Sequence, residues 1–128
     1  MSSSPKMTLD RLRAFDEAWG NKDIDTLMEF MTDDCEYHAS VGPEPGRRFV
    51  GKVAVREGFQ LMFAHDADGE ARGGPAFISG NQGVTEWSYV VTDDHGRRSE
   101  VRGCDIFEFV GDKIRRKDAF RKCLFADD

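Results

Sequence analysis

Apolar residues near the start of the chain recur at three- and four-residue steps, the spacing of a helix with one buried face. This pattern predicts a first helix that begins after the capping residue Thr8 and stops at Gly20 and Asn21. Its apolar positions are Leu9, Leu12, Phe15 and Trp19. A second, shorter helix is predicted from the capping residue Asp23 through Met31, before the polar residues 32–34.

The next segment alternates apolar and polar residues, which is the two-residue period of a half-buried strand. It predicts a strand at 35–41, followed by a loop rich in Gly and Pro at 42–51. Helical spacing returns at 52–64 and predicts a third helix. A second loop is predicted at 65–75, where polar and glycine residues favour mobility and a possible role as a lid.

The remainder of the chain reads as sheet, because strand-like runs are separated by residues typical of turns. The runs are 76–78, 83–92, 97–110 and 113–125. The predicted order is therefore ααβαββββ. Such an order indicates an α+β fold, with the helices on one face of a curved antiparallel sheet.

Length and charge narrow the range of functions. The chain of 128 residues fits one domain, expected at 7–128, after a Ser-rich and disordered tail at 1–6. Its net charge is −6, and basic residues gather only in the strand-like run 113–122, which we interpret as a solvated or interfacial strand face. Nucleic-acid binding is therefore not expected. Without a signal peptide or a long apolar run, we expect no membrane partner and a cytoplasmic location.

Cysteine and histidine residues do not form a metal-binding pattern. The three cysteines are Cys35, Cys104 and Cys123, and the three histidines are His38, His65 and His95. The cysteines are far apart and odd in number, so we expect reduced thiols. The histidines lack the four-residue spacing of a helical metal site. We therefore expect neither a metal nor another cofactor.

Four segments carry a resemblance to a known family. They are AFDEAWGNKDIDTLMEFMTDDCEY, GKVAVREGF, TEWSYV and RGCDIFEFVGDKIRRKDAF. These segments resemble SnoaL-like and ketosteroid isomerase-like proteins of the nuclear transport factor 2-like superfamily, over residues 9–120. The resemblance implies a cone of three helices wrapped by a bent sheet around a hydrophobic pocket, commonly in a homodimer that pairs through the sheet. Many activities share this fold, so the fold does not settle the function.

The ketosteroid isomerase uses an Asp base, with a Tyr and a protonated Asp as hydrogen-bond donors to the oxyanion. A gapless alignment puts the tyrosine position on Phe15 and the base position on Ala39. Neither side chain can donate or accept a proton. The third position is retained as Asp105, so the resemblance makes Asp105 the candidate catalytic residue.

Strand alternation puts Asp105 on the face of Phe107 and Phe109. Burial there favours a neutral carboxyl unless a cation or hydrogen-bond donors face it. Asp105 is then either an acid that serves a ligand carbonyl or one half of a structural ion pair. A two-residue turn in the last hairpin would place Asp118 opposite Asp105, whereas a shifted register would bring Lys117 to that face. The family resemblance favours Lys117.

Other side chains are candidates for the pocket wall. The candidate ligand-binding residues are Phe15, Trp19, Tyr37, Ala39, Phe59, Phe63, Phe107 and Asp118, with Met62 beside them. The same aromatic residues also fit an ordinary core. His38 invites a role as a general base, but alternation turns it away from Ala39 and favours the surface. For Glu86, apolar alternation indicates an outward direction and the family alignment an inward one.

Two functions of different classes follow. The first is an enzyme that isomerises, cyclises, dehydrates or hydrolyses a small apolar carbonyl or ring compound through Asp105 and Lys117. The second is a non-catalytic domain whose pocket only binds an apolar molecule or serves as a scaffold. A homodimer is expected in both cases, because the outer face of the sheet carries Ile106, with Trp87 and Tyr89 as further candidates.

Overall fold

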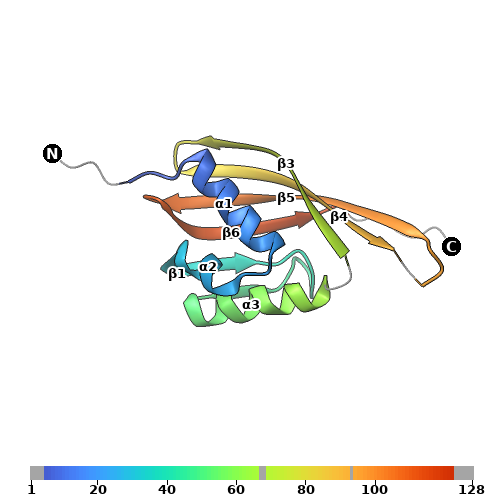
Figure 1. The fold of residues 1–128 in the computed structure, drawn as a ribbon. Coiled ribbons are helices and arrows are strands. Elements are labelled where there is room, and N and C mark those ends of the chain that lie inside the picture. Colours follow the sequence, from blue (N-terminus) through green and yellow to red (C-terminus); the bar gives the residue numbers. More distant parts are fainter. Residues whose placement is uncertain (1–4, 67–68, 93, 123–128) are drawn as a thin grey trace.

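The computed structural model describes residues 5–66, 69–92 and 94–122. These residues form three helices and one six-stranded sheet (Figure 1). The helices are α1 (Leu9–Gly20), α2 (Ile24–Glu29) and α3 (Lys52–His65). The strands are β1 (Met31–His38), β2 (Arg48–Val50), β3 (Gly69–Ser79), β4 (Gln82–Thr92), β5 (Arg98–Val110) and β6 (Lys113–Arg121).

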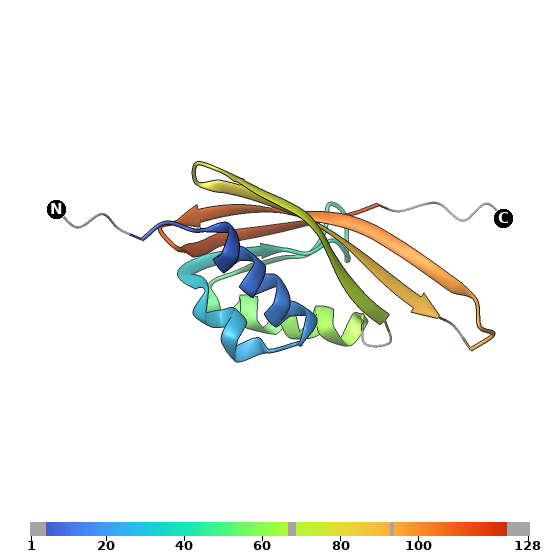
Figure 2. The same ribbon diagram turned by 45° about the horizontal axis from the view of Figure 1, so that its top comes forward.

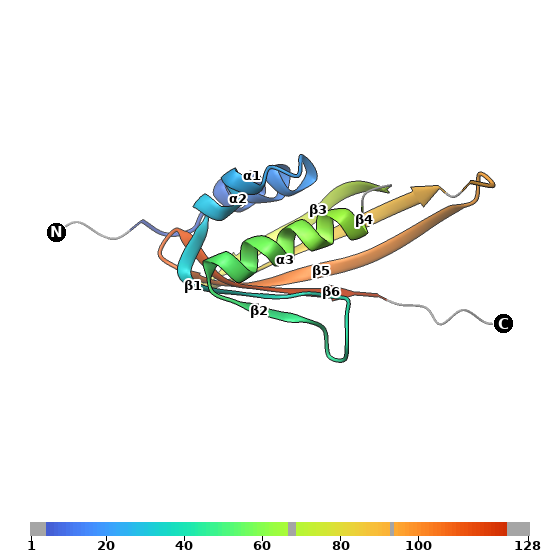
Figure 3. The ribbon, with the colours of Figure 1, turned by 90° about the horizontal axis from the view of Figure 1, so that it is seen from below.

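The strands lie side by side in the order β2-β1-β6-β5-β4-β3. Neighbouring strands are antiparallel, except that β1 and β6 run parallel. Figure 3 shows the three helices on the same side of the sheet, and in Figure 2 the β4–β5 hairpin extends beyond them. The predicted α+β class is confirmed. The short strand β2 changes the predicted order to ααββαββββ.

Both predicted helix starts are confirmed by their caps. The Thr8 side chain accepts a hydrogen bond from the Arg11 amide at 3.1 Å, and the Asp23 side chain accepts one from the Thr26 amide at 3.3 Å. Each cap satisfies an amide that has no partner inside the helix. Of the apolar positions predicted for α1, Leu12 and Phe15 are buried, whereas Leu9 is 40% exposed.

The passage from α2 to β1 differs from the prediction. Met31 begins β1 instead of ending the helix, and β1 ends at His38 instead of Val41. The Ile114 amide donates to the Phe30 carbonyl at 2.7 Å, and Met31 pairs with Ile114, so the ladder with β6 starts at this point. A short apolar run fits both the helical and the strand period, and contacts with a distant strand decided between them.

Strand β2 lies inside the segment that the Gly- and Pro-rich sequence predicted as loop. It pairs with β1, with Phe49 opposite Tyr37. Phe49 is buried and stacks on the Tyr37 ring, with ring centroids 5.8 Å apart. Burial of Phe49 stabilises this strand of three residues, which the sequence analysis predicted as loop because glycines flank it.

The prediction of a mobile loop at 65–75 is wrong for residues 69–75. Strand β3 begins at Gly69 and pairs with β4 as far as Ser79 opposite Gln82. It is an edge strand, and the ladder is interrupted between Gly73 and Ala76, where Pro75 lies. Proline and small residues are tolerated at a sheet edge and at such irregularities. Residues 67 and 68 of the predicted loop, and residues 123–125 of the predicted last strand, lie outside the described residues.

The β5–β6 hairpin has a two-residue turn and a bulge. Val110 pairs with Lys113 across Gly111 and Asp112, and Gly111 has the positive φ of +62° that such turns require. The register then shifts by one residue, because Phe109 pairs with Ile114 whereas Glu108 pairs with Arg116. Arg115 is therefore the extra residue of a bulge. Its effect is to pair Asp105 with Ala119 and Phe107 with Lys117, so that Lys117 shares the inner face with Asp105.

The core between the helices and the sheet is built around Phe15. The Phe15 ring meets the rings of Phe30, Phe59 and Phe107 edge to face, at centroid distances of 5.5, 6.4 and 5.9 Å. Phe15, Phe59 and Phe107 are fully buried. This packing joins α1 and α3 to the middle of the sheet.

Replacement of Phe15 by Ala should lower the free energy of unfolding by about 3–5 kcal/mol, because it leaves a cavity among three rings. Urea denaturation followed by circular dichroism measures the change. Val53→Ala is the matched control, since Val53 lies on α3 with 85% of its surface exposed, and should change stability by less than about 0.5 kcal/mol. Similar losses in the two variants would show that Phe15 does not hold the layers together.

Candidate functional site

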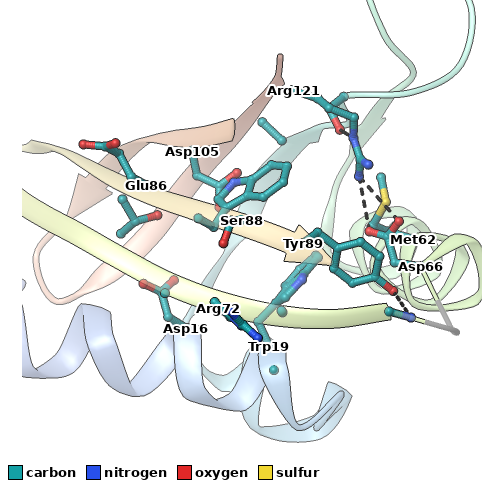
Figure 4. Close-up of a pocket in the computed structure, with 18 of the residues that line it drawn as sticks. Asp16, Trp19, Met62, Asp66, Arg72, Glu86, Ser88, Tyr89, Asp105 and Arg121 are labelled. Carbon is teal, nitrogen blue, oxygen red and sulfur yellow. Dashed lines mark hydrogen bonds and ion pairs between the residues drawn. The ribbon is translucent and has the colours of Figure 1, made fainter. Parts of the chain in front are cut away.

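A cavity of about 150 Å³ lies between the helices and the inner face of the sheet. Its walls come from α1, the end of α3 and strands β1 and β3 to β6. Figure 4 shows Asp16 and Asp105 toward one end of this pocket and Arg121 with Asp66 toward the other. We refer to these as the acidic end and the arginine end.

Asp105 and Lys117 form an ion pair in the pocket wall. Lys117 Nζ lies 3.3 Å from Asp105 Oδ2, and the two residues are only 3% and 6% exposed. The ammonium group also lies over the Trp19 ring at 4.1 Å from its centroid and over the Tyr37 ring at 5.1 Å. A carboxylate and two aromatic faces therefore surround the side-chain nitrogen of Lys117.

Asp16 is a functional candidate that the sequence analysis missed. Its pKa is raised from 3.8 to about 7; burial is the main cause and the nearby Asp105 carboxylate adds to the rise, whereas Lys117 and Arg13 act in the opposite direction. The residue follows Phe15 on α1, so it borders the apolar face of the helix and lines the pocket. Its sequence signal was weak, because an acidic residue beside an apolar stripe is usually solvated.

Tyr37 adds a phenol group to the same wall. Burial raises the pKa of Tyr37 strongly, and the carboxylates of Asp105 and Asp66 add to this rise. The phenol is therefore neutral at physiological pH and can donate a hydrogen bond but does not act as a base. Its ring packs edge to face against Phe59, at a centroid distance of 4.9 Å.

The arginine end is held by a second ion pair. Arg121 Nη2 lies 3.2 Å from Asp66 Oδ2, and Arg121 Nε donates to Ser40 Oγ at 3.3 Å. The guanidinium group also lies over the Trp87 ring, 5.4 Å from its centroid. Next to this pair, Tyr89 Oη accepts a hydrogen bond from the Gly69 amide at 2.7 Å and ties β4 to the first residue of β3. These contacts fix the positions of the aromatic side chains at this end.

The predicted pocket residues separate into two groups. Trp19, Tyr37 and Phe63 line the cavity together with Asp105 and Lys117, and Met62 does so as well. The other apolar candidates lie behind this wall in the core and do not line the cavity: Phe15, Ala39, Phe59 and Phe107. The aromatic residues therefore serve partly as pocket and partly as ordinary core.

Four residues are placed by the sheet register. Asp118 pairs with Ile106 and lies on the outer face, so it does not line this cavity. His38 lies beside it there, with Nδ1 4.0 Å from Asp118 Oδ2, as alternation predicted. Trp87 and Tyr89 share the inner face with Asp105, so their expected place on the outer face is wrong. The bulge at Arg115 is what turns Asp118 to the outer face. For Trp87 and Tyr89, the face is set by the pairing of β4 with β5.

Glu86 is exposed and pairs with Cys104, on the face opposite to Asp105 as apolar alternation indicated, and it also borders the cavity at the acidic end (Figure 4). Cys35 and Cys104 are free thiols, and Cys123 lies outside the described residues. Within 5–66, 69–92 and 94–122, no group of three or more His, Cys, Asp and Glu side chains is arranged to hold a metal ion. No helix in this part of the chain has the length and apolar character needed to cross a membrane.

The sequence matches the SnoaL-like domain family over residues 12–117. The chain belongs to this family. None of the curated proteins matches it. This SnoaL-like domain therefore has a known fold family, while its activity must be argued from its own residues.

Solved structures similar to this SnoaL-like domain agree with its fold. An NTF2-like protein of unknown function from Cytophaga hutchinsonii is 18% identical with a TM-score of 0.72, covering 88% of this chain and 97% of that one. A putative polyketide cyclase from Xanthomonas campestris pv. campestris is 18% identical with a TM-score of 0.67, covering 87% of both chains. TerC, crystallised with polyporic acid, is 16% identical with a TM-score of 0.72, covering 89% of this chain and 90% of that one.

In this SnoaL-like domain, the raised pKa of Asp16 predicts a specific pH dependence of stability. The folded protein binds a proton at Asp16 more tightly than the unfolded chain does, because the pKa of Asp16 is near 3.8 in the unfolded chain. This contribution is complete below about pH 4 and is lost as the pH rises through about 7. The stability of Asp16→Asn relative to the wild type should therefore increase between pH 4 and 7.

Urea denaturation across this pH range measures the difference, and carbon NMR of the Asp16 carboxyl group measures its titration directly. Glu17→Gln is the control, because Glu17 is the next residue on α1 and is exposed. A stability difference that stays constant with pH would contradict the assignment.

Proposed function

We propose that the protein is an enzyme that transfers protons on a small, largely apolar carbonyl compound, with Asp16 as the general acid and base. The observation that carries this proposal is the pKa of Asp16, about 7, in a pocket wall that also holds the buried ammonium of Lys117. A general acid or base works best when its pKa is near the working pH, because both protonation states are then populated.

Lys117 supplies positive charge where the reaction develops negative charge. When a base removes a proton from the carbon next to a carbonyl group, the electron pair of that bond moves toward the carbonyl oxygen. An ammonium group fixed in a water-poor site stabilises this oxygen without having to reorganise. Asp105, Trp19 and Tyr37 hold Lys117 in place for this role.

The proposed step is a proton transfer between substrate and Asp16. The ionised Asp16 carboxylate takes the proton from the carbon, while the carbonyl oxygen lies against Lys117 Nζ. The protonated Asp16 then returns the proton to another atom of the substrate. If the proton returns to another carbon or to the enolate oxygen, the product is an isomer. If the enolate carbon first attacks a second carbonyl carbon of the same substrate, a carbon–carbon bond forms, the electron pair of that carbonyl moves to its oxygen, and Asp16 protonates this oxygen to give a cyclised compound.

The walls of the pocket favour an apolar substrate. Trp19, Phe63 and Trp87 line the cavity, and a cavity of about 150 Å³ is large enough for a ring the size of benzene. Two similar structures carry the name putative polyketide cyclase, from Xanthomonas campestris and Sinorhizobium meliloti. Their names support a carbonyl compound as the substrate class.

A non-catalytic binding domain is the second candidate. Asp105 already neutralises Lys117, and this pair lies among aromatic rings. Such a wall can hold an apolar molecule without taking part in chemistry. The experiment that tests the enzyme also separates these two functions.

Hydrogen–deuterium exchange at the carbon next to a carbonyl group tests the proposed step. The probe is 2-tetralone, an apolar bicyclic ketone, followed by proton NMR in D₂O. The wild-type protein should accelerate the exchange, with a rate that rises as the pH passes through about 7. Asp16→Asn should lower the protein-dependent rate by about 10²-fold or more, because it removes the base.

Glu17→Gln, the exposed neighbour on α1, should exchange the probe at the wild-type rate. Equal rates in wild type and Asp16→Asn would refute Asp16 as the base. If 2-tetralone raises the melting temperature but its exchange is not accelerated, the pocket is a binding site without this chemistry.

We also propose that two copies pair through the outer face of the sheet. Phe77, Val84 and Ile106 lie in one row across β3, β4 and β5, with Phe120 on β6 beside them. Phe77, Ile106 and Phe120 are 59%, 36% and 49% exposed. Association would bury this apolar row, and a two-fold axis lets the same row serve both copies.

Sedimentation should give a particle of twice the chain mass of 14.4 kDa at micromolar concentration. Ile106→Asp should shift it to the monomer, because a carboxylate in the centre of an apolar interface loses its water. Val53→Asp, an apolar-to-acid change on the helical side, should stay dimeric. A wild-type protein that sediments as a monomer would rule out the dimer.

A further inference from the structure

Two polar side chains at the acidic end have hydrogen-bonding capacity that the protein does not use. Thr85 and Asp105 are directly opposite each other in the β4–β5 ladder, so their side chains lie on the same, inner face of the sheet. They are 2% and 6% exposed, and both line the cavity. Thr85 Oγ1 and Asp105 Oδ1 are buried and find no hydrogen-bond partner among the residues that the structure describes.

The two oxygens of Asp105 thus have different surroundings. Oδ2 faces Lys117 Nζ, whereas Oδ1 is left for another donor. A carboxylate only accepts hydrogen bonds, while the Thr85 hydroxyl both donates and accepts. A group that satisfies both atoms must donate a hydrogen to Asp105 Oδ1, and it can either accept one from Thr85 Oγ1 or donate one to it.

From this pairing we infer that the pocket contains a subsite for a hydroxyl group of the ligand, formed by Asp105 Oδ1 and Thr85 Oγ1. A neutral hydroxyl meets both demands at once. A carbonyl or ether oxygen has no hydrogen for Asp105. A carboxylate is repelled by it, and Asp16 adds to the negative character of this end.

The subsite also narrows the substrate class of the proposed enzyme, and this part rests on the proposed function. The two Asp105 oxygens belong to one carboxylate, so a ligand hydroxyl on Oδ1 lies close to a ligand carbonyl held by Lys117. The substrate is accordingly a hydroxy ketone or a related compound, with its hydroxyl group a few bonds from its carbonyl group.

Phenol and toluene test the subsite without any need for catalysis. The two probes match in size and differ by a hydroxyl in place of a methyl group. NMR titration of the protein gives both dissociation constants, and their ratio measures the preference for the hydroxyl. Thr85→Val keeps the shape of the side chain and removes its hydroxyl, so this preference should fall about three- to tenfold, the effect of one lost hydrogen bond.

Two further variants complete the test. Thr85→Ser keeps the hydroxyl and should retain the wild-type preference. Thr92→Val makes the same change at an exposed position of β4 and should leave the preference unchanged. An unchanged preference in Thr85→Val would overturn the subsite, as would wild-type titrations in which phenol does not shift the signals of Thr85 and Asp105.

Stability gives an independent readout. If the Thr85 hydroxyl has no partner within the protein, Thr85→Val should melt at the wild-type temperature or above it, because it removes an unsatisfied buried group. A marked fall in the melting temperature would mean that the hydroxyl is already bonded internally, which also overturns the subsite. These readouts concern binding and folding, so they stand or fall separately from the exchange activity of Asp16.

Discussion

The buried ion pair between Asp105 and Lys117 constrains the rest of the site. Each of these charges would be costly to bury alone, so neither side chain can turn away without exposing the other to an unfavourable surrounding. The pair therefore fixes the Lys117 ammonium against the Trp19 and Tyr37 rings. Asp16 borders the same pocket, and its pKa rises to about 7 mainly because of burial and further because of the Asp105 carboxylate, although Lys117 acts in the opposite direction.

The ion pair depends in turn on one extra residue in β6. Without the bulge at Arg115, the two-residue turn would set Asp118 opposite Asp105, and two carboxylates would meet in the pocket. With it, Lys117 reaches the inner face. The Arg115 side chain contacts carboxylates of Glu36 and Glu108 at 3.5 and 3.4 Å, and such contacts help to hold the bulged strand. The ion pairs of Arg115 on the outer face of the sheet thus help to keep Lys117 in place on the inner face.

Local patterns predicted much of this architecture, and their failures have physical causes. The caps Thr8 and Asp23 and the inner face of β5 around Asp105 were readable, because each depends on neighbours in sequence. Strand β3 was not, because a Gly-rich edge strand carries little alternation and is stabilised by pairing with β4. Asp16 was missed for a similar reason, since its pKa depends on burial and on Asp105, which lies on a distant strand. For the hairpin, the sequence left open whether Lys117 or Asp118 lies on the face of Asp105, and the bulge places Lys117 there.

The polar groups of the pocket are divided between two layers, which limits how a substrate can lie. Asp16 projects from α1, whereas Thr85, Asp105 and Lys117 belong to the sheet. A compound whose oxygen atoms bind to the sheet must present its reactive carbon toward the helix, because the proton acceptor lies there. The aromatic core around Phe15 keeps the two layers at a fixed separation. The distance between these oxygen sites and Asp16 is therefore a property of the core packing, and in the proposed enzyme this distance acts together with the groups themselves to select a short hydroxy ketone.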